Sequence, residues 1–362
     1  MTQAPTVPPQ LRRPGRAATG NASGRYECHA REAFDDGWAL VEEDRVLRTE
    51  LRLEQPRSAI TRNSSPDVPF DRSVNPYRGC EHGCIYCFAR PSHAYLGLSP
   101  GLDFETRLTA KPELPEVLAR ELSRKSYRPA TLAIGTNTDP YQPVEAEQGI
   151  MRGVLEVLRD FNHPVGIVTK GTLIERDLDI LAPMAAQGLV SVGLSVTTLD
   201  PQLSRRMEPR APRPARRLET IRHLSEAGIP TRVMVAPVVP GLTDHETEAI
   251  LGAAKQAGAR AASWIMLRLP LEVAPLFRDW LAEHYPDRAA RILGRVRELH
   301  GGRDYDPHWG RRMRGQGPWA DLARQRFDRA ARRLGLDAPL PRLRTDLFAV
   351  PPKPGDQLTL AL

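Results

Sequence analysis

Short apolar runs alternate with amphipathic stretches along the middle of the chain, from residue 131 onward. Runs of this length predict buried strands, and apolar spacing of three to four residues predicts helices. The predicted strands are Thr131–Thr136, Val165–Thr169, Val190–Val196, Arg232–Val238 and Ala262–Leu267. The predicted helices between them are Gly149–Asp160, Ile174–Gln187, Ala215–Ala227 and Thr243–Gln256. Three glycines, Gly188, Gly228 and Gly258, follow helical stretches and predict where these helices end.

An earlier strand at Ser73–Tyr77 and a helix at Leu114–Arg124 bring the pattern to about six β/α units. Such alternation is typical of an α/β protein with a mainly parallel sheet, either open and doubly wound or closed towards a barrel. In both arrangements the chemistry collects at the carboxyl ends of the strands. The segments predicted there are Thr136–Asp139, Lys170, Ser195–Thr198 and Ala236–Gly241.

The composition narrows the class of protein. The chain has 362 residues, of which 41% are hydrophobic and 26% charged, as expected for a globular protein with a sizeable core. No apolar run approaches the ~18 residues of a transmembrane helix, and residues 1–25 lack the apolar region of a secretory signal. We therefore expect a cytoplasmic protein that does not insert into membranes.

The net charge of +7 comes from a strong bias towards arginine. Residues 1–25 contain four arginines and no acid, which predicts a disordered basic arm that either contacts nucleic acid or is a plain terminus. Residues 300–344 contain eleven arginines and five aspartates, interleaved with Tyr305, Trp309, Trp319 and Phe327. This segment either faces nucleic acid through phosphate and stacking contacts or is an ordinary surface helix.

A further arginine cluster follows the Val190–Val196 strand. It comprises Arg205, Arg206, Arg210, Arg213, Arg216 and Arg217. Two hypotheses remain open for it. The cluster guides an anionic substrate, or it forms a solvated helix start together with Glu208 and Glu219.

Three of the four cysteines, Cys80, Cys84 and Cys87, lie within eight positions directly after the first predicted strand. Scarce residues clustered this tightly at the catalytic end of a sheet favour a metal site. Three thiolates can hold an iron–sulfur cluster that keeps one iron open. A zinc site with His82 or His93 as fourth ligand and a redox dithiol at Cys84 and Cys87 are the alternatives. Cys28 lies 52 residues upstream of Cys80, and an incidental cysteine is the simplest interpretation of it.

The spacing Cys80-x3-Cys84-x2-Cys87, with Tyr86 before the last cysteine, resembles radical S-adenosylmethionine enzymes. The wider run from Asn75 to Arg90 is similar to the group related to spore photoproduct lyase, often called DNA-repair-photolyase-like. Further similar runs are Thr136 to Pro143, Thr169-Lys170, Glu208 to Pro212 and Val235 to Gly241. The resemblance covers roughly Arg57 to His284.

This resemblance implies a partial (β/α)6 barrel with a [4Fe–4S] cluster on Cys80, Cys84 and Cys87. S-adenosylmethionine would bind the fourth iron and be cleaved to a 5′-deoxyadenosyl radical that abstracts hydrogen from substrate. The residues that match the family's S-adenosylmethionine contacts are Tyr86 for adenine, Thr136 and Asn137 for the methionine end, Asp139, Lys170 for the carboxylate, Ser195 and Thr197 for ribose, and the backbone around Ala236 and Val239 for adenine.

Around that barrel, assigned to residues 71–285, we expect four further segments. They are the disordered arm 1–25, an extension 26–70 that packs on the barrel, a basic helical extension 286–348 and a tail 349–362. The resemblance also implies an external electron donor of the flavodoxin or ferredoxin type and a possible nucleic-acid substrate, in keeping with DNA repair by a lyase-like reaction. A non-enzymatic zinc protein that binds nucleic acid is the alternative function.

The sequence departs from spore photoproduct lyase at one chemically important place. That enzyme is thought to return hydrogen through a cysteine near the motif that here reads Gly135 to Pro140, but this chain has no cysteine after Cys87. Thr136 occupies or neighbours the position, and an alcohol is a poor hydrogen-atom donor compared with a thiol. The substrate and the catalytic hydrogen-return residue are therefore left unassigned.

Overall fold

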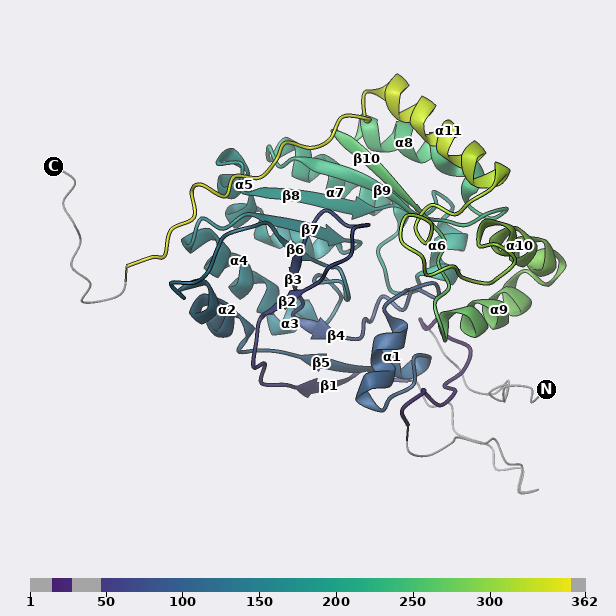
Figure 1. The fold of residues 1–362 in the computed structure, drawn as a ribbon, viewed down its shortest axis with the longest axis horizontal. Coiled ribbons are helices and arrows are strands. Elements are labelled where there is room, and N and C mark those ends of the chain that lie inside the picture. The colour runs from purple at the N-terminus through teal and green to yellow at the C-terminus, as the bar shows by residue number, and fades with distance from the viewer. Residues whose placement is uncertain (1–14, 28–46, 353–362) are drawn as a thin grey trace.

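The computed structural model describes residues 15–27 and 47–352; residues 1–14, 28–46 and 353–362 lie outside the description (Figure 1). A seven-stranded sheet runs through the centre in the order β10-β9-β8-β7-β6-β3-β2. Its strands are β2 (Ile60–Arg62), β3 (Arg72–Val74), β6 (Leu132–Ile134), β7 (Val165–Thr169), β8 (Val190–Ser195), β9 (Thr231–Val238) and β10 (Ala261–Met266). All neighbours pair in parallel except β2, which is antiparallel to β3.

The prediction of an α/β protein with a mainly parallel sheet is confirmed, and six strands are parallel. Their order in the sheet follows the chain without a reversal, whereas an open doubly wound sheet reverses at its switch point. This order disfavours the doubly wound alternative. It also brings the carboxyl ends of all six parallel strands to one edge.

The prediction of one continuous strand at Ser73–Tyr77 is wrong. Ser73 and Val74 belong to β3, while Tyr77 and Arg78 form β4, which pairs with β5 (Arg107–Ala110) in a separate three-stranded sheet with β1 (Glu50–Leu53). Pro76 lies between the two strands, has no N–H group to donate, and restricts Asn75. The chain therefore turns out of the central sheet just before the cysteines.

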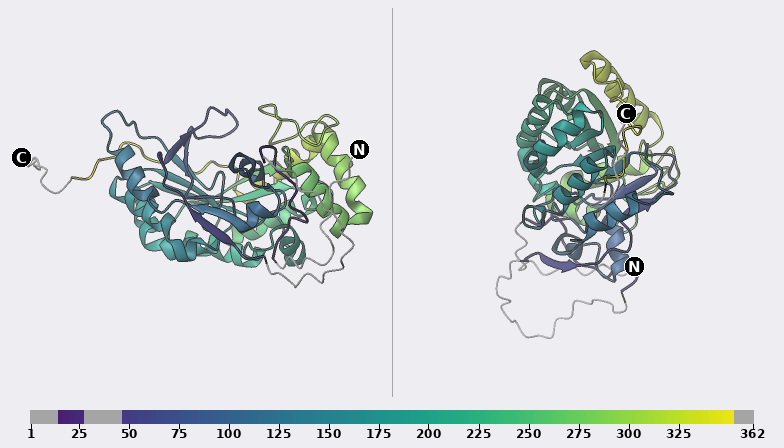
Figure 2. Two further views of the ribbon diagram at one scale, coloured as in Figure 1. Left: turned by 90° about the horizontal axis from the view of Figure 1, so that it is seen from below. Right: turned by 90° about the vertical axis from the view of Figure 1, so that its left-hand side faces the viewer.

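Helices connect the strands and cover the sheet (Figure 2). The helices of the first part of the chain are η1 (Arg90–Leu96), α1 (Leu102–Thr106), α2 (Leu114–Leu122), α3 (Glu145–Gln148) and α4 (Ile150–Asp160). Those of the middle part are η2 (Thr172–Asp177), α5 (Leu178–Ala186), α6 (Pro201–Met207), α7 (Pro214–Glu226), η3 (Asp244–Glu246) and α8 (Thr247–Gln256). The last are α9 (Val273–His284), α10 (Pro286–Leu299) and α11 (Pro318–Leu334).

Helix α11 and the segment after it bind the C-terminal part of the chain to the sheet. Phe327 of α11 packs against Trp264 of β10, and the N–H of Ala262 donates to the carbonyl of Leu336. The following segment runs along the upper left of the molecule in the view of Figure 1, and the N–H of Arg344 donates to the carbonyl of Gly188. Its Phe348 packs against the main core. Within the described residues no helix is long and apolar enough to cross a membrane.

Part of the arm predicted to be disordered is folded, so that prediction is wrong for residues 15–25. The N–H groups of Ala17 and Ala18 donate to the carboxylate of Glu105, and the guanidinium of Arg16 donates to the backbone carbonyl of Glu105. These hydrogen bonds to the buried Glu105 stabilise the folded conformation of the segment. The composition of the arm gives no sign of this acceptor. Residues 1–14 of the arm, Cys28 and residues 353–362 of the tail lie outside the described residues.

The predicted glycine helix ends are confirmed by their backbone conformation. Gly188, Gly228 and Gly258 have φ values of 73°, 77° and 97°. Each lies in the left-handed region, where glycine avoids the steric cost of a side chain.

We predict opposite effects on stability for two glycine-to-alanine substitutions at sites where an added Cβ meets no other atom. Gly228→Ala forces a Cβ into a left-handed turn and should lower the free energy of unfolding by about 1 kcal/mol. Gly252→Ala, in the middle of α8 with no atom within 4 Å of the new Cβ, should raise it by about 0.5–1 kcal/mol. Urea denaturation of both variants measures the difference, and equal effects would contradict the assigned backbone conformations.

Candidate functional site

The cysteine loop, residues 79–87, begins directly after β4 and is shaped by two glycines. Gly79 has φ 75° and Gly83 has φ 63°. A Cβ on Gly79 would lie 2.7 Å from a Leu108 methyl carbon, and one on Gly83 would lie 2.7 Å from Glu105 Oε2. Neither position accepts a side chain. The tight loop therefore depends on both glycines.

Arg90 holds this loop from inside the protein and is fully buried. Its guanidinium donates to the carbonyls of Cys84 at 3.0 Å and Gly83 at 3.1 Å. It also donates to the carbonyls of Pro100 at 3.0 Å and Gly101 at 2.9 Å. The remaining partner is the carboxylate of Glu105, at 2.5 Å from Nη2. A single cation thus ties the cysteine loop to the start of α1.

Residues after β6 support the opposite side of the loop. Thr138 Oγ1 donates to the carbonyl of Gly79 at 2.7 Å, and Gln142 Nε2 donates to Thr138 Oγ1 at 3.1 Å. Gln142 Oε1 accepts from the N–H of Glu81 at 2.8 Å. The loop is therefore fixed between α1 and the carboxyl end of β6.

Asp139 joins the ends of β6 and β7 to this loop. Its carboxylate accepts from Thr169 Oγ1 at 2.6 Å and from the N–H of Lys170 at 2.7 Å. His82 Nδ1 lies 3.3 Å from the same carboxylate. Burial acts to raise the pKa of Asp139, but His82 and these donors outweigh burial and hold it below its usual range. Asp139 is thus an ionised positioning residue.

A second buried ion pair lies under Tyr86. The Tyr86 hydroxyl donates to Glu208, whose carboxylate also accepts from Thr197 Oγ1 at 2.8 Å and pairs with Arg217. Arg217 donates in addition to the carbonyl of Ser195 at 3.2 Å. Burial raises the pKa of Glu208, yet Arg217 and Lys170 lower it to about 2. Glu208 therefore stays ionised at neutral pH and fixes Tyr86 against β8.

Lys170 differs from the other cations of the site because its ammonium makes no hydrogen bond or ion pair to any described residue. Its ammonium lies 5.7 Å from the centre of the Tyr86 ring. Burial lowers the pKa of Lys170, but the nearby Cys84 and Glu208 raise it by more than burial lowers it, so the net shift of the pKa is upwards. Lys170 is thus a charged group beside the cysteine loop that is available to an anionic ligand.

The other predicted contact residues differ in whether their polar groups already have hydrogen-bond partners in the protein. The side chains of Thr136, Asn137 and Ser195 make no hydrogen bond within the described chain. The carbonyl of Ala236 accepts from Thr197 Oγ1 at 3.2 Å. Val239 uses both backbone polar groups in its own turn, since its N–H donates to Thr243 Oγ1 and its carbonyl accepts from the following residues.

Burial is the largest influence on the pKa of both Cys80 and Cys84. Burial raises the pKa of Cys80 well above its usual value and that of Cys84 to about 12, despite the nearby Lys170. A bound metal deprotonates such thiols, so the donor set fits a metal cluster better than a redox dithiol.

Each of the two candidate fourth zinc ligands uses one ring nitrogen in another contact. His82 interacts with Asp139, and His93 Nε2 lies 2.9 Å from the carbonyl oxygen of Arg107. Among the described residues, no three His, Cys, Asp or Glu side chains form a group suited to one metal ion. An iron–sulfur cluster spaces its cysteines more widely, because each one binds a different iron atom.

The predicted arginine cluster divides into two groups. Arg210, Arg216 and Arg217 pair with Glu81, Glu175 and Glu208. Arg205, Arg206 and Arg213 line a surface groove of about 670 Å³. The hypothesis of a solvated helix start is thus wrong for Arg217, which is buried.

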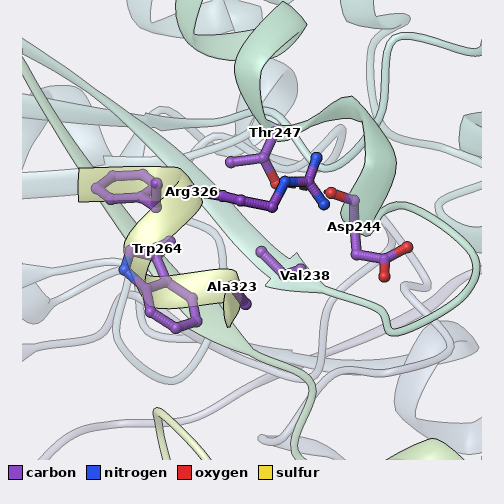
Figure 3. Close-up of a pocket in the computed structure, with 7 residues that line it drawn as sticks. Val238, Asp244, Thr247, Trp264, Ala323 and Arg326 are labelled. Atoms are coloured by element: carbon purple, nitrogen blue, oxygen red, sulfur yellow. Dashed lines mark hydrogen bonds between the residues drawn. The ribbon is translucent and has the colours of Figure 1, made fainter. Parts of the chain in front are cut away.

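The basic C-terminal segment is less open than its sequence indicates. Arg312 pairs with Asp67, Arg326 pairs with Glu248, and Arg314 lies over the ring of Trp264. A cavity of about 10 Å³ lies beside Arg326, between Trp264 of β10, η3 and α11. Figure 3 shows the residues that line it. A cavity of this size holds at most one water molecule. Trp309 is exposed, but Phe327 is buried in packing.

The comparisons with known proteins agree with this geometry. The model of the radical SAM superfamily matches residues 74–254. An uncharacterized protein of Mycobacterium tuberculosis is 43% identical over 235 residues, which are 64% of this chain and 68% of that protein. An uncharacterized protein of Methanocaldococcus jannaschii is 25% identical over 215 residues, 59% of this chain and 76% of that protein.

Among solved structures, spore photoproduct lyase has a similar fold. The complex with dinucleoside spore photoproduct aligns over 78% of this chain and 79% of that one, with a TM-score of 0.57 and 14% identity. The chain belongs to the radical SAM superfamily. It is an enzyme of that class, and its cofactors are a [4Fe–4S] cluster and S-adenosylmethionine.

Sequence reasoning did not identify the residues that brace the site. They are Arg90, Glu105, Gln142, Glu208 and Arg217. Arg90 and Glu208 lie within the runs that resemble the family, but their partners are 15 and 9 residues away. In a chain this rich in arginine, no local pattern marks these charges as buried.

We predict a large cost for removing the buried cation of the loop. Arg90→Met leaves Glu105 charged and buried, which should lower the free energy of unfolding by about 3–5 kcal/mol and reduce the iron retained after reconstitution. The control, Arg324→Met, removes an exposed ion pair with Asp321 and should change the free energy of unfolding by less than about 0.5 kcal/mol. Similar values for the two variants in urea denaturation would contradict the bracing role of Arg90.

We predict an acid-sensitive contact between η2 and α7. Burial raises the pKa of Glu175, but Arg216, Thr220 and His223 lower it from 4.5 to about 2. The stabilisation is therefore complete above pH 4.5 and is lost as the pH falls towards 2.

Glu175→Gln should accordingly destabilise the protein by about 1–2 kcal/mol at pH 7, with a difference that shrinks towards pH 2. Glu219→Gln, on an exposed acid beside Arg216, is the control and should have little effect. Thermal unfolding of the apo-protein across this range measures both, and a pH-independent difference would refute the prediction.

Proposed function

We propose that Cys80, Cys84 and Cys87 bind three irons of the cluster and leave the fourth iron for S-adenosylmethionine. The proposal is supported by family membership and by the contacts that hold the cysteine loop in place. It is also supported by the sequence, in which these three are the only cysteines after Cys28. When bound, the reduced cluster would supply one electron to the sulfonium of S-adenosylmethionine. The C5′–S bond would then break to give methionine and a 5′-deoxyadenosyl radical that abstracts hydrogen from substrate.

The observation that carries this proposal is the unpaired Lys170 beside Cys84 and Tyr86. An ammonium here can pair with the carboxylate of S-adenosylmethionine. Tyr86, held by Glu208, offers a fixed ring face to adenine. Thr136 and Asn137 would bind the methionine end, and Ser195 the ribose, while Thr197 acts through Glu208.

The backbone near Ala236 is the better candidate for adenine recognition than Val239, whose polar groups are already used. Asp139 positions Lys170 through the N–H group of that residue. We take the six parallel strands as the partial (β/α)6 barrel of the family. A barrel core of this kind would keep water away from the strand ends, as a radical intermediate requires.

The reaction partners follow from the resemblance alone. We expect an external electron donor of the flavodoxin or ferredoxin type and a nucleic-acid substrate, in a lyase-like reaction related to DNA repair. The chain has no cysteine after Cys87, so hydrogen return to a substrate radical would use a different donor from the thiol of spore photoproduct lyase.

We predict that anaerobic reconstitution followed by dithionite and S-adenosylmethionine produces 5′-deoxyadenosine, measured by mass spectrometry. Cys80→Ala, Cys84→Ala and Cys87→Ala should each lose the cluster iron and the product. Cys28→Ala, the control, should keep its iron content.

Lys170→Met should keep the iron but raise the KM for S-adenosylmethionine at least tenfold, and Lys170→Arg should restore part of the loss because it keeps the charge. Loss of iron in Cys28→Ala would contradict the assigned ligands. Zinc in place of iron in the purified wild-type protein would instead favour the zinc alternative.

A further inference from the structure

A groove lies on the protein surface between three segments that are distant in the sequence. Its walls come from α6 and the residues after it, from Gly15 and Arg16, and from His284 of α9. We call it the arginine groove, because Arg16, Arg205, Arg206 and Arg213 line it. Its volume of about 670 Å³ exceeds that of a single inorganic ion and suits a ligand with several functional groups.

The arginine groove carries positive charge without a matching acid. None of the described residues that line it is an aspartate or a glutamate. Arg205 and Arg213 are exposed, and their side chains make no hydrogen bond or ion pair to any residue that the structure describes. By contrast, the neighbouring Arg210, Arg216 and Arg217 all have carboxylate partners. The groove is therefore the part of this arginine-rich region where charge is left unneutralised.

Arg16 shows the same excess of positive charge. Its guanidinium donates to the carbonyl of Glu105 and to Thr49 Oγ1 at 3.0 Å, which fixes its position. Burial and the nearby Arg210 lower its pKa, and Glu105 and Glu81 do not fully compensate. A bound anion would relieve this repulsion.

The groove is built on rigid elements that also support the cysteine loop. Asp200 caps α6 by accepting from the N–H groups of Gln202 and Leu203. Trp280 Nε1 donates to the carbonyl of Arg206 at 3.1 Å, and the N–H of Ile85 donates to the carbonyl of Met207 at 3.0 Å. A ligand held by α6 therefore lies on the element that contacts the cysteine loop directly.

We propose that the arginine groove binds the phosphate groups of a ligand that carries at least two of them. Guanidinium groups match phosphate oxygens through paired N–H donors, and several of them converge here. Arg205 and Arg213 are the principal contacts, since both are free. The phosphates belong either to a small pyrophosphate-containing molecule or to a short phosphodiester chain, which share this chemistry.

Equilibrium binding to the reconstituted full-length protein tests the proposal. Fluorescence anisotropy follows a labelled single-stranded oligonucleotide, and calorimetry follows ADP, each over a range of salt concentrations. The wild-type protein should bind at least one of the two, more weakly as salt increases. Binding of ADP identifies a small pyrophosphate-type ligand, and binding of the oligonucleotide alone identifies a phosphodiester chain.

The variants address the two free arginines. Arg205→Gln with Arg213→Gln should weaken binding at least tenfold, and for the oligonucleotide should reduce the slope of log K against log salt by roughly 0.7 per lost contact. Arg205→Lys with Arg213→Lys keeps the charge and should retain most of the affinity. Arg324→Gln, on an exposed arginine of α11, is the matched control and should bind like the wild type.

Two results would overturn the proposal. One is a wild-type protein that binds neither probe, and the other is a glutamine double variant that binds as tightly as the wild type. The changed side chains are exposed, so an unchanged melting temperature will confirm that the variants fold. Binding does not require cleavage of S-adenosylmethionine. Failure of this proposal is therefore distinguishable from failure of the proposed function.

Discussion

The ion pair between Arg90 and Glu105 is the contact on which the candidate site depends. Both side chains are fully buried. Arg90 uses its donors on carbonyls of the cysteine loop and of the turn before α1, while Glu105 accepts from Ala17 and Ala18. Burying two charges is costly unless their remaining hydrogen bonds are satisfied, and here backbone groups satisfy them. The pair thus connects four segments that lie around the three cysteines.

A second buried pair, Glu208 with Arg217, performs the same task for the other half of the site. It holds the Tyr86 hydroxyl and the Ser195 carbonyl, and so aligns the cysteine loop with the end of β8. Asp139 links the ends of β6 and β7 in a similar way. Within this framework of paired charges, the ammonium of Lys170 lies over the Tyr86 ring without an ion pair to a described residue.

Arginine has two separate uses in this protein, which explains why its sequence bias is hard to interpret. Arg90 and Arg217 are internal hydrogen-bond donors that replace water around backbone carbonyls. Arg205 and Arg213 keep their charge at the surface. The eleven arginines of residues 300–344 left open a nucleic-acid face or an ordinary surface helix, and several of them are covered by acids or aromatic rings. Counting charges along the sequence therefore does not show how much positive charge is open, because only the fold decides which charges are paired.

The sequence by itself determined the alternation of strands and helices, the strand ends at which the chemistry gathers, and the cysteine spacing. Each is a local property: apolar runs are continuous, glycine stops are single residues, and the three cysteines lie within eight positions. The tertiary structure alone decided which charges meet, since Glu105 faces Ala17 and Glu208 faces Tyr86 across long separations in the chain. It also decided that β3 and β4 belong to different sheets, and that residues 15–25 are folded. A polar group that is buried without a partner is costly, so burial favours pairs of polar groups. These pairs form only when distant segments of the chain are packed together.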